Sequence, residues 1–210
     1  MENIVDYKKE YKELYLPKTE PALIKIPEIQ YASVIGKGNP NAPNGEYKNA
    51  IEILYGIQYT IKMSKKGTYT PDGYFDYVVP PLEGFWWSDT ETEMKNKSNY
   101  NWISVIRLPE YVTKDVFIWA CTEASKKKKI DTAKAQLLKI AEGLCVQCMH
   151  IGSFNDEPKT LKSIDDFIEK NNLIKDINDK RRHHEIYLSD PRKTAETKMK
   201  TALRIPAKSK

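Results

Sequence analysis

The sequence has few cysteines, few glycines and no long apolar run, and each shortage excludes a class of protein. Its 210 residues include three cysteines, an odd number that indicates a reducing compartment and not a disulfide framework. Nine glycines and 30% charged residues exclude collagen and low-complexity disorder. No apolar run approaches the ~18 residues of a membrane span, and Met1–Glu10 is too charged for a signal peptide. We therefore expect a soluble, cytoplasmic protein that does not contact a membrane.

Positive charge is unevenly distributed along the chain. The formal net charge is +5, yet residues 192–210 carry +6 by themselves and the preceding 191 residues carry −1. We interpret 192–210 as a basic, solubilising tail and the four lysines at 126–129 as a solvated loop. These lysines lack the interleaved aromatic side chains that binding of single-stranded nucleic acid requires. Nucleic acid is therefore not an expected partner, and nothing in the sequence specifies an oligomeric state.

The first half of the chain alternates strand and helix patterns. Residues 29–35 alternate with the period of two that is typical of a strand, which ends at Gly36. A helix follows, because apolar residues recur at i, i+3 and i+4 from Tyr47 to Ile61. The other elements expected here are a helix at 6–15 and strands at 77–80, 84–87 and 101–108.

The second half restarts the pattern near Thr113. Residues 116–122 are predicted as a strand, and Asp131 is predicted to cap a helix that extends to Ala141 and ends at Gly143. The remaining elements expected are a strand at 144–153, a helix over 161–168 and a last strand at 182–188.

This order of elements predicts an α+β fold. Strand–helix–strand occurs twice, in pseudo-repeats at about 27–110 and 113–190 of a single domain of residues 1–210. Neither repeat covers its own sheet face, so we expect the two to share antiparallel sheet. A crevice where the halves meet is a natural place for a ligand.

The segment Cys145-Val-Gln-Cys148, with His150 two residues later, resembles part of a zinc site. On a strand, positions 145 and 148 point to opposite faces, so both reach one metal only at a bulge. A thioredoxin-type pair opens a helix, whereas this pair follows one. We interpret both cysteines as buried structural thiols and expect neither a metal nor a cofactor.

Aromatic residues are plentiful, with thirteen tyrosines and four tryptophans. Trp86 and Trp87 are adjacent on a predicted strand, so at most one packs in the core while the other faces outward or into a cavity. Trp119 shares a face of the strand predicted at 116–122 with Phe117 and Cys121. Rings that fill the core are one interpretation, and walls of a pocket are the other.

A glutamate stands in the middle of the last predicted strand. Alternation places His183, Glu185 and Tyr187 on one face of that strand. Burying this carboxylate costs several kcal/mol unless it is paired or lies in a cavity. Glu185 is thus interpreted either as the partner of Arg181 or Arg182, or as an acid within an aromatic pocket.

The segment His184-Glu-Ile-Tyr-Leu-Ser-Asp-Pro-Arg192 resembles the closing motif of the GyrI-like small-molecule-binding domain, a module also fused to multidrug-sensing regulators of the BmrR type. Residues 16–40, 83–87 and 102–109 are similar to the stand-alone branch of that family, so the resemblance covers nearly the whole chain. It implies an α+β tandem repeat around a pseudo-twofold axis. It also implies that the glutamate of the motif, here Glu185, lies at the floor of the ligand pocket.

Stand-alone members of the family include hydrolases that open the cyclopropane of DNA-alkylating spirocyclopropyl dienones. The resemblance implies that Glu185 orients or deprotonates a water molecule, while Tyr187 or Tyr55 hydrogen-bonds the carbonyl that becomes a phenolate. The expected ligand is a small aromatic or cyclopropane-bearing molecule. Its expected binding residues are Trp86, Trp87, Trp119 and His183.

Two other functions are kept as alternatives. The same carboxylate and rings suit a receptor that binds flat cationic drugs and releases them unchanged. Inhibition of DNA gyrase rests on the family name alone and ranks last, because the folded part is nearly neutral. The thirteen polar residues 88–100 directly follow the tryptophan pair and are predicted to border the pocket mouth as a lid, or to form a surface excursion without a role.

Overall fold

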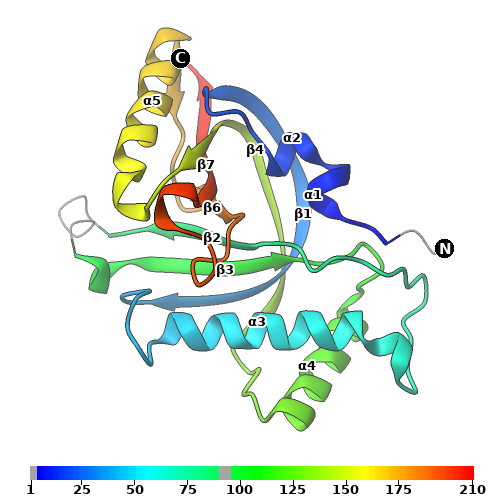
Figure 1. Ribbon diagram of the computed structural model, residues 1–210. Helices are drawn as coiled ribbons and strands as arrows, with labels where there is room; N and C mark the ends of the chain where they lie inside the picture. The colour runs from blue at the N-terminus through cyan, green and yellow to red at the C-terminus, as the bar shows by residue number, and fades with distance from the viewer. Residues whose placement is uncertain (1–3, 90–95) are drawn as a thin grey trace. The chain divides into compact units, whose positions relative to one another are not determined.

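A computed structural model describes residues 4–89 and 96–210 of the chain (Figure 1). The chain forms two compact units that interleave in sequence. The first unit comprises Met1–Glu10, Ile29–Leu82 and Trp87–Ile140, and the second comprises Tyr11–Glu28, Glu83–Trp86 and Ala141–Lys210. None of the helices within the described residues is long and apolar enough to cross a membrane.

The strands form an antiparallel sheet, as an α+β fold requires. In the described residues its order is β4-β1-β3-β2-β6-β7-β5, and an additional pairing joins β4 to β7. Three of these strands belong in part to each unit, namely β1 (Ala22–Lys37), β2 (Leu82–Trp87) and β4 (Ala135–Ile151). The predicted fold class is therefore confirmed.

In the first unit, β1 pairs with β3 (Asn101–Arg107), with Tyr31 opposite Arg107. Two helices, α3 (Glu46–Lys62) and α4 (Lys114–Lys128), pack against each other. They approach closely at Gly56, where a Cβ atom would lie 4.0 Å from the Cβ atom of Ala124 on α4 and 3.0 Å from a methyl group of Ile130, which follows α4. Figure 1 shows α4 crossing beside one end of α3.

In the second unit, β7 (Lys200–Ser209) pairs with β4, with β6 (His183–Tyr187) and with β5 (Leu173–Lys175). Helix α5 (Glu157–Lys170) has Ile164 and Ile168 on its buried face. The core that they join also contains Val146, Cys148, Leu173, Leu203, Ile205 and Ala207. Because β7 is paired on both sides, it holds β6 in place.

Five predicted elements are confirmed in type and approximate bounds. They are helices α3 and α5 and strands β2, β3 and β6. The two helices have clear helical periodicity and β6 alternates over its whole length, so local pattern and tertiary burial agree there. The helix expected at 6–15 forms two short helices, α1 (Tyr7–Glu10) and α2 (Lys12–Tyr15).

The strand predicted at 116–122 is wrong, because these residues lie in helix α4. The hydroxyl of Thr113 accepts the backbone N–H of Val116 and caps the helix, and Ala120 and Ala124 are buried. The expectation that Phe117, Trp119 and Cys121 share a strand face falls with it. The lysines at 126–129 are not a loop either. They form the last turn of α4 and its left-handed cap at Lys129, where positive charge suits the helix dipole.

The helix predicted from Asp131 to Ala141 is also wrong, because β4 begins at Ala135. The Ser33 hydroxyl donates to the carbonyl of Gln136, so this end of the strand is tied to β1 within the first unit. Gly143 does not end a helix. It lies within β4 with φ of 67°, a conformation that glycine adopts readily.

The basic tail predicted at 192–210 is wrong as well. Residues 200–209 form β7, and seven of them from Thr201 to Ala207 are buried. The charge of Arg204 is neutralised inside the protein by carboxylates described below. In two smaller differences, residues 77–80 form only an isolated bridge from Tyr77 to Val5, and β1 begins before Pro27. The lid predicted at 88–100 falls partly outside the described residues and stays a prediction.

Candidate functional site

Strand β6 presents two different faces, as its alternation predicts. His183, Glu185 and Tyr187 are partly exposed, whereas His184 and Ile186 are fully buried. On the neighbouring strand, Trp86 lies opposite His183 and Gly84 lies opposite Glu185. Directly opposite residues of an antiparallel pair share a face, so the two strands together build one surface.

The carboxylate of Glu185 is held on both oxygens. Its Oε1 lies 3.0 Å from Nε2 of His183, and its Oε2 accepts the hydroxyl proton of Tyr187 at 2.8 Å. The indole N–H of Trp86 donates to the same tyrosine oxygen at 2.9 Å. We call Trp86, His183, Glu185 and Tyr187 the Glu185 cluster. All four belong to the second unit, and the Glu185 side chain keeps 14% of its surface exposed.

The hydrogen bonds define what each group can do. If Glu185 is ionised, Nε2 of His183 is the donor of this hydrogen bond, and in a neutral imidazole Nδ1 is then an acceptor. That Nδ1 atom is buried and has no hydrogen-bond partner among the described residues. Each carboxylate oxygen retains lone pairs beyond the bond that it already accepts. The carboxylate can therefore accept a further proton or hydrogen bond while its orientation is fixed.

The arginine interpretation of Glu185 is wrong. Arg181 pairs with Asp176 and donates to the carbonyls of Glu142 and Leu144, and Arg182 pairs with Asp179. Within the residues that the structure describes, Glu185 forms no ion pair with a lysine or arginine. Its negative charge is therefore stabilised by hydrogen-bond donors and not by a fixed cation.

Gly84 is a site residue that the sequence interpretation missed. A Cβ atom at this position would lie 2.6 Å from the indole nitrogen of Trp86 and 3.1 Å from the hydroxyl of Tyr187. The Trp86 ring thus lies directly over the backbone of Gly84, and only the absence of a side chain permits this contact. The glycine in Glu83-Gly-Phe-Trp-Trp87 was the available signal.

The opposite face of the same two strands carries a buried ion cluster. His184 lies between two carboxylates, with Nε2 3.0 Å from Oε2 of Glu83 and Nδ1 2.9 Å from Oε1 of Glu142. Arg204 approaches the same Glu142 oxygen at 3.1 Å. None of these four side chains exposes more than 4% of its surface. We call them the His184 cluster, and the ring of Phe85 stacks on His184 at 4.0 Å.

The His184 cluster shifts the pKa values of its members. Burial disfavours the charged imidazole, but Glu142 and Glu83 outweigh burial and raise the pKa of His184 above its usual value. Burial also disfavours the carboxylate of Glu142, yet His184 and Arg204 outweigh it and lower its pKa. The two acids and the two bases carry compensating charges, so the buried cluster is neutral as a whole.

The other predicted site residues belong to the first unit. Tyr55 stacks on Tyr59 with ring centroids 6.3 Å apart, and Trp119 packs on Tyr69 at 4.5 Å. Trp119 lies on helix α4 and not on a strand. Trp87 is the last residue of β2 and is half-buried. Of the seven predicted residues, the structure brings four together, and the roles of Tyr55, Trp87 and Trp119 stay predictions.

Cys145 and Cys148 are buried on β4, as expected for structural thiols. Burial raises the pKa of Cys145 to about 12 and that of Cys148 to about 11, which disfavours the reactive thiolate. Cys145 lies opposite Pro206 and Cys148 lies opposite Leu203. Among residues 4–89 and 96–210, no group of three or more His, Cys, Asp or Glu side chains is placed to hold a metal ion.

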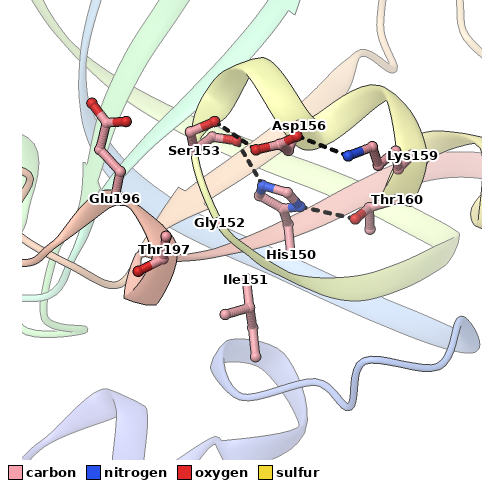
Figure 2. Close-up of a pocket in the computed structure, with 9 residues that line it drawn as sticks. All are labelled: His150, Ile151, Gly152, Ser153, Asp156, Lys159, Thr160, Glu196 and Thr197. Atoms are coloured by element: carbon pink, nitrogen blue, oxygen red, sulfur yellow. Dashed lines mark hydrogen bonds and ion pairs between the residues drawn. The ribbon is translucent and has the colours of Figure 1, made fainter.

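A cavity of about 410 Å³, lined by both polar and apolar groups, lies at the end of β4 (Figure 2). His150 forms its floor, with Nδ1 2.9 Å from the Thr160 hydroxyl and Nε2 2.9 Å from the Ser153 carbonyl. Both ring nitrogens are therefore engaged. The cavity contains no member of the Glu185 cluster, although Phe154, next to Ser153, packs edge-on against Tyr187 at 5.9 Å.

Comparison with known families identifies the class of protein. The model of a family described as "GyrI-like small molecule binding domain" matches residues 19–208. The match covers most of the chain and includes both β2 and β6. The chain therefore belongs to the GyrI-like family of small-molecule-binding domains. A search of the curated proteins gave no match.

Solved structures support the same assignment. An uncharacterized conserved protein from Listeria innocua is 47% identical, with a TM-score of 0.93 over 97% of this chain and 100% of that chain. A protein described as a hydrolase from Listeria innocua is 46% identical, with a TM-score of 0.91 over 98% and 100%. The C-terminal domain of EcmrR is 12% identical, with a TM-score of 0.53 over 91% and 98%, and shares the fold.

Proposed function

We propose that this chain is a hydrolase that opens the cyclopropane ring of alkylating small molecules, with Glu185 as the general base. The observation that carries the proposal is the geometry of Glu185. Its carboxylate is oriented on both oxygens and remains partly exposed, and no lysine or arginine in the described part of the chain neutralises it. The similarity to proteins described as hydrolases, at 46% identity, supports an enzymatic role.

In the proposed reaction, water adds to a spirocyclopropyl cyclohexadienone. The oxygen of water bonds to a methylene carbon of the cyclopropane, and the strained carbon–carbon bond at the spiro centre breaks. The electron pair of that bond moves into the ring and onto the carbonyl oxygen, which becomes a phenolate. Glu185 takes one proton from the water, and the phenolate is protonated afterwards, so that the product is a phenol bearing a hydroxyethyl-type arm.

The neighbours of Glu185 have different tasks in this proposal. His183 and Tyr187 fix the two carboxylate oxygens, and Trp86 fixes Tyr187 through its indole N–H. Because the proton of Tyr187 points to Glu185, we assign Tyr187 to positioning the base. Stabilisation of the developing phenolate stays with Tyr55 as a sequence-based prediction. The ring of Trp86 is 9% exposed, so its contact with an aromatic substrate stays a sequence-based prediction.

The test is the variant Glu185→Gln, which keeps the shape of the side chain and removes its basicity. We expect it to hydrolyse a synthetic spirocyclopropyl cyclohexadienone about 10²- to 10⁴-fold more slowly than the wild type, the usual contribution of a general base. Liquid chromatography with mass spectrometry follows the gain of one water molecule. Glu169→Gln, on the exposed face of α5, is the matched control and should be fully active. Equal rates for wild type and Glu185→Gln contradict the proposal.

A receptor for flat cations is the second candidate function. It is favoured by the uncompensated charge of Glu185 next to the indole of Trp86, because carboxylates and aromatic faces both attract organic cations. The same mass-spectrometric assay separates the two functions. A receptor returns every ligand with its mass unchanged, and its affinity for a cationic dye falls in Glu185→Gln.

A further inference from the structure

The strands that carry the Glu185 cluster also carry the His184 cluster on their opposite faces. His184 is the neighbour of Glu185 on β6, and it lies directly opposite Phe85 on β2. Glu83 and Phe85 flank Gly84, over which the Trp86 ring lies. The contacts of His184, Glu83 and Phe85 therefore fix the backbone directly beside Glu185 and Gly84.

The contacts of His184 join strands that must stay in register for the Glu185 cluster to form. Glu83 ties the imidazole to β2, Glu142 ties it to β4, and Arg204 ties Glu142 to β7. The stacked ring of Phe85 adds a second tie to β2. Any displacement of β2 along β6 moves the Trp86 indole away from the Tyr187 hydroxyl, because these two groups stand on different strands.

We propose that His184 is a positioning residue for the Glu185 cluster, and that its protonation state sets the contact between Trp86 and Tyr187. This inference deepens the proposed function, since the pH dependence that it predicts for turnover rests on Glu185 as the base. The effect on the contact itself requires no substrate. It can therefore be tested even if the proposed reaction is incorrect.

The charges around His184 explain why one proton matters. Glu83 faces it from β2, Glu142 from β4 and Arg204 from β7, with the thiol of Cys145 and the guanidinium of Arg181 near Glu142. With His184 protonated, the four-residue cluster is neutral. Loss of the proton leaves a net buried negative charge, which a protein interior tolerates poorly. We therefore expect the ties from His184 to Glu83 and Glu142 to loosen when the imidazole loses its proton.

The experiment uses the ligand-free protein labelled with 5-fluorotryptophan. Fluorine NMR follows Trp86, assigned through Trp86→Phe, between pH 6 and pH 10, and carbon-detected spectra follow the His184 ring in the same samples. We expect the Trp86 signal to shift with the same midpoint as His184, above pH 6.5. In Glu142→Gln, which removes the nearest carboxylate charge, both midpoints should fall together by about one pH unit or more.

Controls and contrary results are defined in the same titration. Glu169→Gln should leave both midpoints unchanged. A Trp86 signal that does not respond, or that responds with a midpoint different from that of His184, overturns the proposal. If Glu142→Gln does not fold, Glu83→Gln makes the same test at the other ring nitrogen, and the coincidence of midpoints in the wild type stands as a test by itself. If His184 had a role in stability alone, Glu142→Gln would lower the melting temperature, but the midpoints of the Trp86 and His184 signals would not shift together.

When a hydrolysable substrate is in hand, kcat/KM should decline at high pH with the midpoint measured for His184. A decline that does not move in Glu142→Gln, while the Trp86 signal does, locates the failure in the proposed reaction and not in the positioning role.

Discussion

The two faces of β6 treat charged side chains in opposite ways. On the buried face, His184 and Arg204 compensate Glu83 and Glu142, and the four side chains are almost completely removed from water. On the other face, Glu185 keeps part of its surface exposed and is held by a histidine, a tyrosine and, through the tyrosine, a tryptophan. The charges on the buried face compensate one another, whereas Glu185 forms no ion pair with a lysine or arginine in the described part of the chain.

Strand β6 therefore serves two purposes, since one face holds the register of the sheet and the other carries Glu185. A buried charge cluster is costly to form but strongly disfavours any other arrangement of its members, because each unpaired charge would remain in the interior. Such a cluster is suited to holding strands in register. The Glu185 cluster relies on that register, because its donors come from β2 and β6. Three substitutions and one pH titration test this difference between the two faces.

Breaking the buried cluster should have the largest effect on stability. Arg204→Met removes the cation that compensates Glu142 and leaves the cluster with a net negative charge. We expect the free energy of unfolding to fall by about 3–5 kcal/mol, as for other buried ion pairs that lose one partner. Urea denaturation measures it, and Arg192→Met, at an exposed pair, is the control. A loss below about 1 kcal/mol would show that the cluster does not hold the strands.

A methyl group at Gly84 should disrupt the Glu185 face without touching a charge. The new Cβ in Gly84→Ala would overlap the Trp86 indole and press on the Tyr187 hydroxyl. We expect a loss of about 1–3 kcal/mol, typical of overpacking, and a red shift of the tryptophan emission. Gly67→Ala, where the nearest atom is 3.4 Å away, is the matched control and should change neither. Unchanged emission in Gly84→Ala argues against the packing of Trp86 described here.

The pH dependence of stability should arise on the buried face. Because the pKa of His184 is raised, its contribution is complete below about pH 6.5 and is lost as the pH rises through the folded value. Because the pKa of Glu142 is lowered, its contribution is complete above about pH 4.5 and is lost on acidification.

Urea denaturation from pH 4 to pH 9 should therefore show the greatest stability between these limits. The alkaline decline should not exceed ~1.4 kcal/mol per pH unit for one group. In Glu142→Gln the alkaline decline should still begin near pH 6.5, but it should end at lower pH and be smaller, whereas Glu185→Gln should follow the wild-type curve. If Glu185→Gln abolished the alkaline decline in stability, the decline would arise on the Glu185 face and not on the buried face, which contradicts the prediction.

Removing the hydroxyl of Tyr187 should have the smallest effect. In Tyr187→Phe, Glu185 loses one donor and the Trp86 indole loses its acceptor, at hydrogen bonds that are partly buried. We expect a loss of about 1 kcal/mol, the net value of an ordinary hydrogen bond. The comparison with Tyr59→Phe, at an exposed ring, isolates the hydrogen bonds from the loss of a hydroxyl. A loss of unfolding free energy of about 3 kcal/mol or more would show that the Tyr187 hydroxyl contributes as much to stability as an ion pair of the His184 cluster.

Several elements could be predicted from sequence because their own pattern decides them. Alternation over 183–187 correctly placed Glu185 and Tyr187 on one face with His183. Helices α3 and α5 have periodic apolar faces that local spacing reveals. The family, too, could be recognised from the motif around Glu185 and from the segment Glu83–Trp87, and the match to residues 19–208 confirms it.

Residues 113–143 could not be predicted in this way, because their local preferences are weak or misleading. Residues 116–122 are rich in β-branched and aromatic side chains, which favour a strand, yet the Thr113 cap and the packing of α4 against α3 make them helical. In 133–141 the apolar spacing suits a helix, but the place of β4 beside β1 in the sheet makes residues 135–141 a strand. Here tertiary contacts outweigh propensities of a few tenths of a kcal/mol per residue.

The sequence by itself determined the family, the α+β class and the face of β6 that carries Glu185, since these depend on motifs and on alternation within short segments. Only the tertiary structure decided that Arg204 is a buried ion-pair partner and not part of a basic tail, because Glu142 lies 62 residues away in the chain. It also decided that Gly84 stands beneath Trp86 and that His184 lies between two carboxylates. These contacts join separate strands, and strand pairing between distant segments is set by the burial of the whole sheet and not by any local pattern.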